Sequence, residues 1–132
     1  MTPDARQDDA TSGRTRVLVV DDNIDGAEMM AEALDILGYS AAVAHDGPDA
    51  LRIEREFSPQ VALLDIGLPT MDGYELARRL RDVSPAIKLV AITGYGRESD
   101  RQRSREAGFA AHVEKPVDLD KLSALLVELA KS

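Results

Sequence analysis

Carboxylate side chains follow two apolar runs, where they could bind a metal ion. The run RVLVV (16–20) is followed directly by Asp21 and Asp22, and the run VALL (61–64) is followed by Asp65. Carboxylates that converge raise each other's pKa and need a compensating positive charge. Hard oxygen ligands suit Mg²⁺, and beside such an ion Asp65 could act as a nucleophile that forms an aspartyl phosphate.

A hydroxyl and an ammonium group follow two further apolar runs. Thr93 follows IKLVAI (87–92), and Lys115 stands just after the weaker run FAAHV (109–113). Lys115 could hold a phosphoryl oxygen as a point charge, and the Thr93 hydroxyl could donate to another oxygen. Three carboxylates, one ammonium group and one Mg²⁺ sum to zero charge, so the site would be balanced only with the metal bound.

Each polar residue also has an ordinary structural interpretation, because loops begin where strands end. For Asp21 the alternative is a helix N-cap, a role for which Asn23 competes. His45 and Asp46 likewise follow the weaker run SAAVA (40–44). The metal hypothesis therefore depends on the positions taken together.

The segments between these runs have helical spacing, which places the polar residues in a βα architecture. Apolar residues share one helical face in two segments, Ile24, Ala27, Ala31 and Leu34 in the first and Leu119, Leu122, Leu126 and Leu129 in the second. Gly38 and Gly108 stand at expected helix C-caps, and Pro48 at a helix start. Asp72 and Glu75 resemble a capping box. The pattern predicts five strands, each followed by a helix, in a parallel sheet covered on both faces. Ligands of such sheets bind at the carboxyl ends of the strands.

Composition bounds the class of protein. The 132 residues fit one domain, and we predict a disordered tail or linker over 1–14 and the domain over 15–132. The net charge of −8 argues against nucleic-acid binding and against docking to an anionic membrane. The sequence contains no cysteine, no apolar run long enough to span a bilayer and no signal peptide, so we expect a soluble, cytoplasmic domain.

Four motifs in this order and spacing identify a family. They are VVDDN (19–23), LLDIGLPTMDGYEL (63–76), AITGYG (91–96) and VEKPVD (113–118). With them the chain resembles, from residue 16 to about 130, a receiver domain of the response regulators of two-component signalling. The resemblance implies a flavodoxin-like, doubly wound sheet of five parallel strands in the order 2-1-3-4-5, flanked by five helices.

The resemblance also implies roles for the acidic residues. Asp65 would accept a phosphoryl group from a phosphohistidine on a histidine kinase or histidine phosphotransfer protein. Asp21 and Asp22 would form the acidic pocket, with Asp22 and Asp65 as direct ligands of Mg²⁺. The backbone carbonyl of Gly67 would be the third protein ligand.

Further residues would transmit or tune the signal. Thr93 would be the switch hydroxyl and Lys115 the phosphoryl contact, with a cis bond to Pro116. His112 stands where the family often has an aromatic switch residue, and its alternative is a half-exposed histidine on a strand. Tyr95, together with Gly67, would set the access of water to the phosphoryl group.

Two helices could contribute partner surfaces. Arg97, Arg101 and Arg105 lie four residues apart, as a solvated stripe or as part of an output surface. Met29 and Met30 are core filler by default, but the family commonly docks its kinase through this helix. An exposed methionine there would be a candidate contact.

The leading interpretation is a signalling module rather than an enzyme, a monomer or weak dimer without an output domain. It would act as a relay, a phosphate sink or an output, either alone or within a hybrid kinase. One alternative is a Mg²⁺-dependent phosphohydrolase, against which Gly67 counts because such enzymes need a second acid there. The other is a scaffold that binds a partner without phosphorylation, in which case Asp65→Asn would leave function unchanged.

Overall fold

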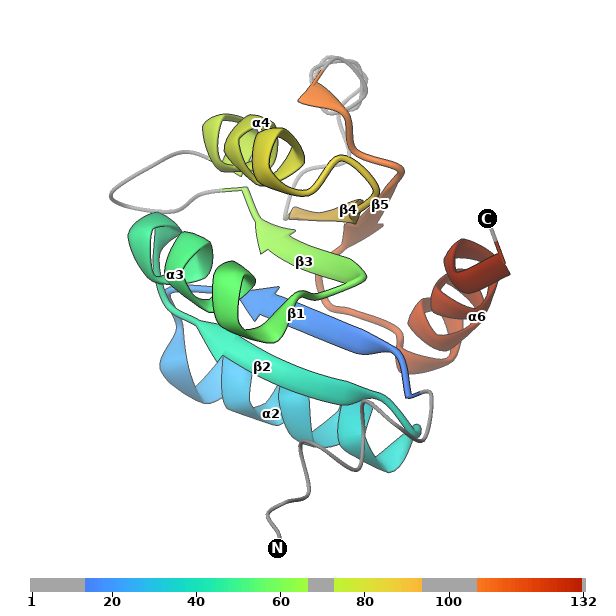
Figure 1. Cartoon of the computed structure of the whole chain (residues 1–132). Coiled ribbons are helices and arrows are strands. Elements are labelled where there is room, and N and C mark those ends of the chain that lie inside the picture. Colours follow the sequence, from blue (N-terminus) through green and yellow to red (C-terminus); the bar gives the residue numbers. More distant parts are fainter. Residues whose placement is uncertain (1–13, 67–72, 94–106, 132) are drawn as a thin grey trace, which may run out of the picture.

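A parallel sheet covered by helices on both faces forms the molecule (Figure 1). The structure is a computed structural model and describes residues 14–66, 73–93 and 107–131. The strands are β1 (Arg16–Val20), β2 (Ser40–Ala44), β3 (Val61–Asp65), β4 (Lys88–Thr93) and β5 (Ala111–Glu114). The helices are α2 (Ile24–Ile36), α3 (Gly47–Phe57), α4 (Gly73–Val83) and α6 (Leu119–Lys131).

The strand order is β2-β1-β3-β4-β5, and every pairing is parallel. This confirms the predicted five-stranded, doubly wound sheet. Within the described part of the chain there are four helices rather than the five expected. The remaining helix was expected between β4 and β5, where residues 94–106 lie outside the description.

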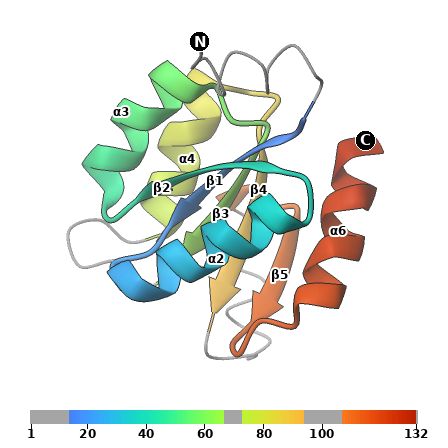
Figure 2. The same cartoon turned by 90° about the horizontal axis from the view of Figure 1, so that it is seen from below.

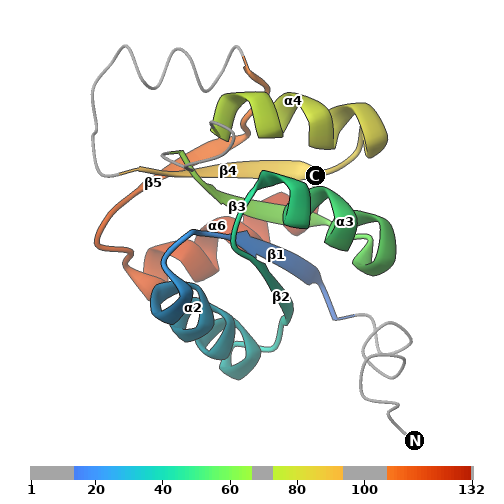
Figure 3. The same cartoon turned by 90° about the vertical axis from the view of Figure 1, so that its left-hand side faces the viewer.

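The central strands β1, β3 and β4 bury both of their faces, because successive side chains point to opposite sides of the sheet and helices cover both sides. Leu18 and Val20 of β1 pack on one side, and Val17 and Val19 pack on the other. Figures 2 and 3 show α3 and α4 covering the first side and α2 and α6 covering the second. Four consecutive buried apolar residues are therefore the sequence pattern of a sheet enclosed on both faces.

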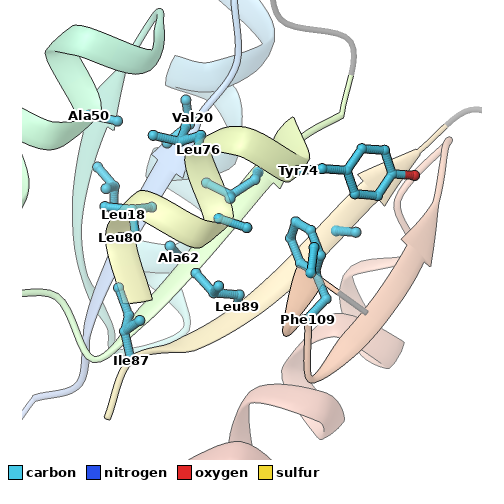
Figure 4. Close-up of a cluster of buried hydrophobic side chains, with 14 of the residues drawn as sticks. Leu18, Val20, Ala50, Ala62, Tyr74, Leu76, Leu80, Ile87, Leu89 and Phe109 are labelled. Carbon is cyan, nitrogen blue, oxygen red and sulfur yellow. The ribbon is translucent and has the colours of Figure 1, made fainter. Parts of the chain in front are cut away.

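The core beneath α4 holds the one aromatic pair of the described residues (Figure 4). Tyr74, in the first turn of α4, meets Phe109, two residues before β5, edge to face with ring centroids 6.2 Å apart. Leu76 and Leu80 of α4 are fully buried beside them. The Tyr74–Phe109 contact therefore packs the first turn of α4 against the segment that leads into β5.

Polar side chains and glycines fix the helix ends. The Asn23 side chain accepts a hydrogen bond from the Gly26 amide, so Asn23, and not Asp21, is the N-cap of α2. Asp46 caps α3 by accepting from the Asp49 amide at 2.8 Å. Gly38 follows α2 with a φ of +100°, as the predicted C-cap requires. Asp72 of the predicted capping box lies outside the described residues.

Two apolar residues expected on the packed helix faces are exposed. Ile24 and Leu119 are the first residues of α2 and α6, and their exposed fractions are 53% and 43%. Their partners Leu34 and Leu126 are fully buried. The helical period identifies the packed face correctly, but the first turn of each helix extends beyond the edge of the core.

Candidate functional site

Three carboxylates converge at the carboxyl edge of the sheet. β1 and β3 are neighbours with Val20 opposite Leu64, so the residues that follow, Asp21 and Asp65, reach the same edge. One carboxylate oxygen from each of Asp21, Asp22 and Asp65 lies within 4.8 Å of the others. The sheet thus brings together the three acids that the sequence predicted as a group.

Lys115 supplies a positive charge to this cluster. Its Nζ donates a hydrogen bond to Oδ2 of Asp65 at 3.2 Å. Its backbone amide donates to the carbonyl of Thr93 at 2.8 Å, and the bond from Lys115 to Pro116 is cis, as expected. The Asp65 side chain is 14% exposed, so its carboxylate is still open to solvent although Lys115 contacts it.

Thr93 ends β4 beside the cluster. β4 places Ile92 opposite Asp65, so Thr93 lies one residue further toward the carboxyl edge. Thr93 itself is 7% exposed and pairs with Glu114, the residue before Lys115. A carboxylate, a hydroxyl and an ammonium group therefore stand at the carboxyl ends of three adjacent strands, the ammonium group one residue beyond the end of β5.

The electrostatics of the cluster favour a bound cation. Partial burial raises the pKa of Asp21, the negative charge of Asp65 raises it further, and the Asn23 amide and Lys115 lower it. Three carboxylates against one ammonium group leave an excess of negative charge. Ionising Asp21 in this setting costs free energy, and a divalent cation would recover it.

The donor set suits Mg²⁺. Carboxylate oxygens from Asp21, Asp22 and Asp65 are the hard ligands that this ion prefers, and the described residues of the cluster include no histidine or cysteine ligand. Asp22 is exposed, which leaves room for the water ligands that Mg²⁺ usually retains. Gly67, whose carbonyl was expected as a further ligand, lies outside the described residues.

Two neighbours of the acids were given no part in the site by the sequence prediction: His45 was noted only as a polar residue after a weaker apolar run, and Gly73 was assigned no role. Nδ1 of His45, at the end of β2, lies 3.3 Å from the backbone carbonyl of Asp21. Gly73 begins α4 against the residues that end β3: a Cβ atom there would lie 2.9 Å from Cα of Ile66 and 3.2 Å from the carbonyl of Asp65. In the sequence, the only sign of this close approach of α4 to the end of β3 was a glycine, Gly73, at an expected helix start.

The proposed tuning residues are described only in part. His112 lies half-buried in β5, opposite Ala91, and lines an open hollow with Glu114 and Lys121. Tyr95, Arg97 and Arg101 lie outside the described residues, so their predicted roles stay predictions. Of the two methionines of α2, Met29 is 69% exposed, whereas Met30 packs against the core.

An acidic cluster with a lysine and a threonine at the carboxyl edge of a 2-1-3-4-5 sheet defines a CheY-like α/β domain, and comparison with known proteins agrees. The model of the response regulator receiver domain family matches residues 17–127. A sensor histidine kinase, RcsC of Salmonella typhi, is 35% identical over 87% of this chain. An uncharacterized 14.6 kDa protein of Leptolyngbya boryana is 34% identical over 82% of this chain and 84% of its own length.

Solved structures agree with the sequence relatives. A CheY-like response regulator receiver domain protein from Methanospirillum hungatei superposes with a TM-score of 0.81 at 29% identity, covering 89% of this chain and 95% of that one. The chain spans 12% of the length of the RcsC kinase. This chain belongs to the response regulator receiver domain family of two-component signalling. None of the helices in the described residues is long and apolar enough to cross a membrane.

Proposed function

We propose that Asp65 accepts a phosphoryl group from a phosphohistidine and that the modified domain changes its protein contacts in a two-component pathway or phosphorelay. One observation carries the proposal: the accessible carboxylate of Asp65 is held by Lys115 at 3.2 Å and lies within 4.8 Å of two further carboxylates. The candidate nucleophile Asp65, the ammonium group of Lys115 and a set of oxygen ligands for a hard metal ion thus lie together in one site.

The residues present suffice to assist the transfer. A carboxylate oxygen of Asp65 attacks phosphorus in line with the P–N bond of the donor. The new P–O bond forms as the P–N bond breaks, and the electron pair of the P–N bond goes to the imidazole nitrogen. Lys115 holds a phosphoryl oxygen as a fixed charge. Mg²⁺ bound by Asp21, Asp22 and Asp65 would neutralise phosphoryl oxygens in the transition state.

The response to phosphorylation runs through the ends of β4 and β5. The hydroxyl of Thr93 moves toward the new phosphoryl group. Because the Thr93 carbonyl accepts the Lys115 amide, the movement reaches the strand that carries His112. Phosphorylation then shifts an equilibrium between two arrangements of this face.

The phosphodonor is a histidine kinase or a histidine phosphotransfer protein. The helix α2 begins beside the acidic cluster, and its exposed side supports such docking because it carries Met29, which is 69% exposed. Large apolar side chains in this setting are candidate interface contacts. The likeness to a segment of a sensor histidine kinase supports a place in a phosphorelay.

The domain works in the cytoplasm as a phosphorylation-dependent signalling module that assists its own phosphorylation and dephosphorylation, rather than as an enzyme that acts on a substrate. A multiple-turnover phosphohydrolase would release many phosphates per chain from a small ester such as p-nitrophenyl phosphate. We expect release to stay near one per chain, and sustained turnover would contradict this part of the proposal.

Intact mass spectrometry tests the phosphoacceptor directly. The full chain is incubated with acetyl phosphate and Mg²⁺ beside the Asp65→Asn variant and a sample in excess EDTA. We expect one added phosphoryl group on the native chain and none in either comparison. Asp82→Asn, at an exposed position near the end of α4, is the matched control and should be labelled normally.

Beryllofluoride binding separates a short-lived phosphoryl group from an absent one. If no adduct is seen but the chain binds beryllofluoride with Mg²⁺, the phosphoryl group forms and is hydrolysed quickly. If neither an adduct nor binding occurs, the chain is a phosphorylation-independent scaffold. Labelling that survives Asp65→Asn would place the acceptor elsewhere.

A further inference from the structure

A groove lies at the amino-terminal edge of the sheet, on the opposite side from the acidic cluster. It has a volume of about 350 Å³ and is lined by the start of β1, the α3–β3 and α4–β4 connections and the end of α6. In Figure 2 the strand arrowheads point to one edge, whereas the start of β1 and the end of α6 lie at the other. Nothing in the phosphoacceptor chemistry uses this edge.

The groove combines an apolar floor with a positive rim. Pro59 and Ile87 are buried in the floor, and Leu129 of α6 closes one side. Arg16 and Lys88, both half-buried, are the charged residues among the described residues that line it, and no carboxylate lines it. In a chain with a net charge of −8, this edge is set up to attract negative charge.

Hydrogen bonds preform the rim. The Arg16 amide donates to Oε1 of Gln60, and the Gln60 amide returns a bond to the Arg16 carbonyl, both at 2.9 Å. Nε of Arg16 donates to the carbonyl of Ser58 at 2.9 Å, and the Lys88 amide donates to the Gln60 carbonyl at 3.0 Å. A rim fixed before binding lowers the entropy cost of binding.

The first residues of this chain are the occupant that the geometry favours. Thr15 lines the groove, so the segment that precedes it starts at the rim. Arg14 holds that start, since its guanidinium donates to the carbonyls of Gly38 at 3.1 Å and Tyr39 at 3.2 Å. A tethered segment has an effective concentration of about 1 mM.

The composition of the segment complements the groove. Residues 1–13 contain three aspartates, Asp4, Asp8 and Asp9, against one arginine, Arg6. Asp9 stands six residues before Thr15, and this length of chain reaches up to about 20 Å. We propose that residues 1–13 bind in the groove of their own domain, with Asp8 and Asp9 against Arg16 and Lys88.

Because the groove is remote from Asp65, such docking leaves the phosphoacceptor accessible. It instead ties the segment to the end of α6 through Leu129 and Ala130, which line the groove. The inference does not depend on the proposed phosphoryl chemistry, and its test requires no phosphorylation.

Disulfide trapping tests the proposal, because the chain has no cysteine of its own. Ala10→Cys is combined either with Ala86→Cys, an exposed position that lines the groove, or with Ile36→Cys. Ile36 is 84% exposed and follows Asp35, which bonds Arg14 at 3.3 Å, so it is a control within similar reach. Effective concentrations come from glutathione redox titration of the full-length variants.

We expect an effective concentration about five- to tenfold higher for the Ala86 pair than for the Ile36 pair. Adding Asp8→Asn with Asp9→Asn, or Lys88→Gln, or raising the salt concentration should remove the difference. Equal values for the two pairs would overturn the proposal. Disulfides between chains would also overturn it, and would assign the groove to a second copy.

Discussion

The ammonium group of Lys115 lies 3.2 Å from Oδ2 of Asp65, although the two residues are 50 positions apart in the sequence. The contact places the positive charge of Lys115 directly beside the carboxylate that would accept the phosphoryl group. In Lys115→Gln we expect acetyl phosphate labelling of Asp65 to slow by about 10²-fold, because an electrostatic contact to the transferring group is lost. Since Lys115 is 44% exposed, the free energy of unfolding should change by less than about 1 kcal/mol. Labelling kinetics by intact mass, beside denaturant unfolding, check both; undiminished labelling would contradict the role.

Because the carboxylates of the acidic cluster repel one another, removing the charge of Asp21 should stabilise the metal-free domain. The folded-state pKa of Asp21 is raised above its ordinary value, chiefly by burial. The folded state therefore holds this proton more tightly, and the stability it provides is present at low pH and is lost as the pH rises through the folded pKa. Asp21→Asn should raise the Tm in EDTA at pH 7 by roughly 2–4 °C, with less gain at pH 4.

Mg²⁺ should reverse that ranking. An ion that binds only the folded state stabilises it more, the more tightly it binds, so the native chain should gain more from added Mg²⁺ than Asp21→Asn. Scanning calorimetry in EDTA and in excess Mg²⁺ measures the difference. Equal gains for both proteins would mean that Asp21 does not contribute to the metal site.

Thr93→Ala should separate phosphorylation from its consequence. The hydroxyl is not the nucleophile, so Mg²⁺-dependent labelling of Asp65 should remain within about threefold of native, whereas the response of β5 should weaken. Amide chemical shifts of β5, including His112, are compared with and without beryllofluoride. Thr15→Ala, at the opposite edge of the sheet, is the matched control. Full native shift changes in Thr93→Ala would rule out the switch role.

The convergence of the acidic site followed from the sequence for a physical reason. Parallel strands deliver their carboxyl ends to one edge, so Asp21, Asp65 and Lys115 could be grouped once their apolar runs were recognised as strands. The same rule placed Thr93 beside them. This inference required only local patterns and one general property of parallel sheets.

Features that depend on contacts between distant segments could not be predicted in this way. Asn23 and Asp21 are both good N-caps, and only the path of the chain out of β1 selects Asn23. The exposure of Ile24 depends on where the core ends and not on its helical phase. The groove at the amino edge gathers residues from both ends of the domain and from two connections between them, so no local pattern indicates it.

Gly73→Ala should disturb the phosphoacceptor without touching its side chain. A Cβ atom would come 2.9 Å from Cα of Ile66, and that backbone leads directly from Asp65. We expect a loss of about 1–3 kcal/mol in the free energy of unfolding, as for other overpacked sites, together with slower labelling of Asp65. Gly26→Ala is the control, since its Cβ would meet only side-chain atoms of Asn23, 3.4 Å or more away. Urea unfolding that ranks the two variants equally would contradict the steric argument.

Met29→Ala should weaken phosphorylation by a protein donor while leaving chemical phosphorylation intact. Met29 is 69% exposed on α2 and contributes little to the core, so the fold and the reaction with acetyl phosphate should be unchanged. A truncated apolar contact at an interface centre costs about 1–2 kcal/mol, which predicts transfer from a phosphohistidine protein reduced by roughly 5- to 30-fold at subsaturating concentrations. Val83→Ala, exposed at the end of α4, controls for loss of surface hydrophobicity. Transfer kinetics from the most active donor in a panel of histidine kinases and phosphotransfer proteins decide the matter: equal slowing by both variants would remove α2 as the docking surface.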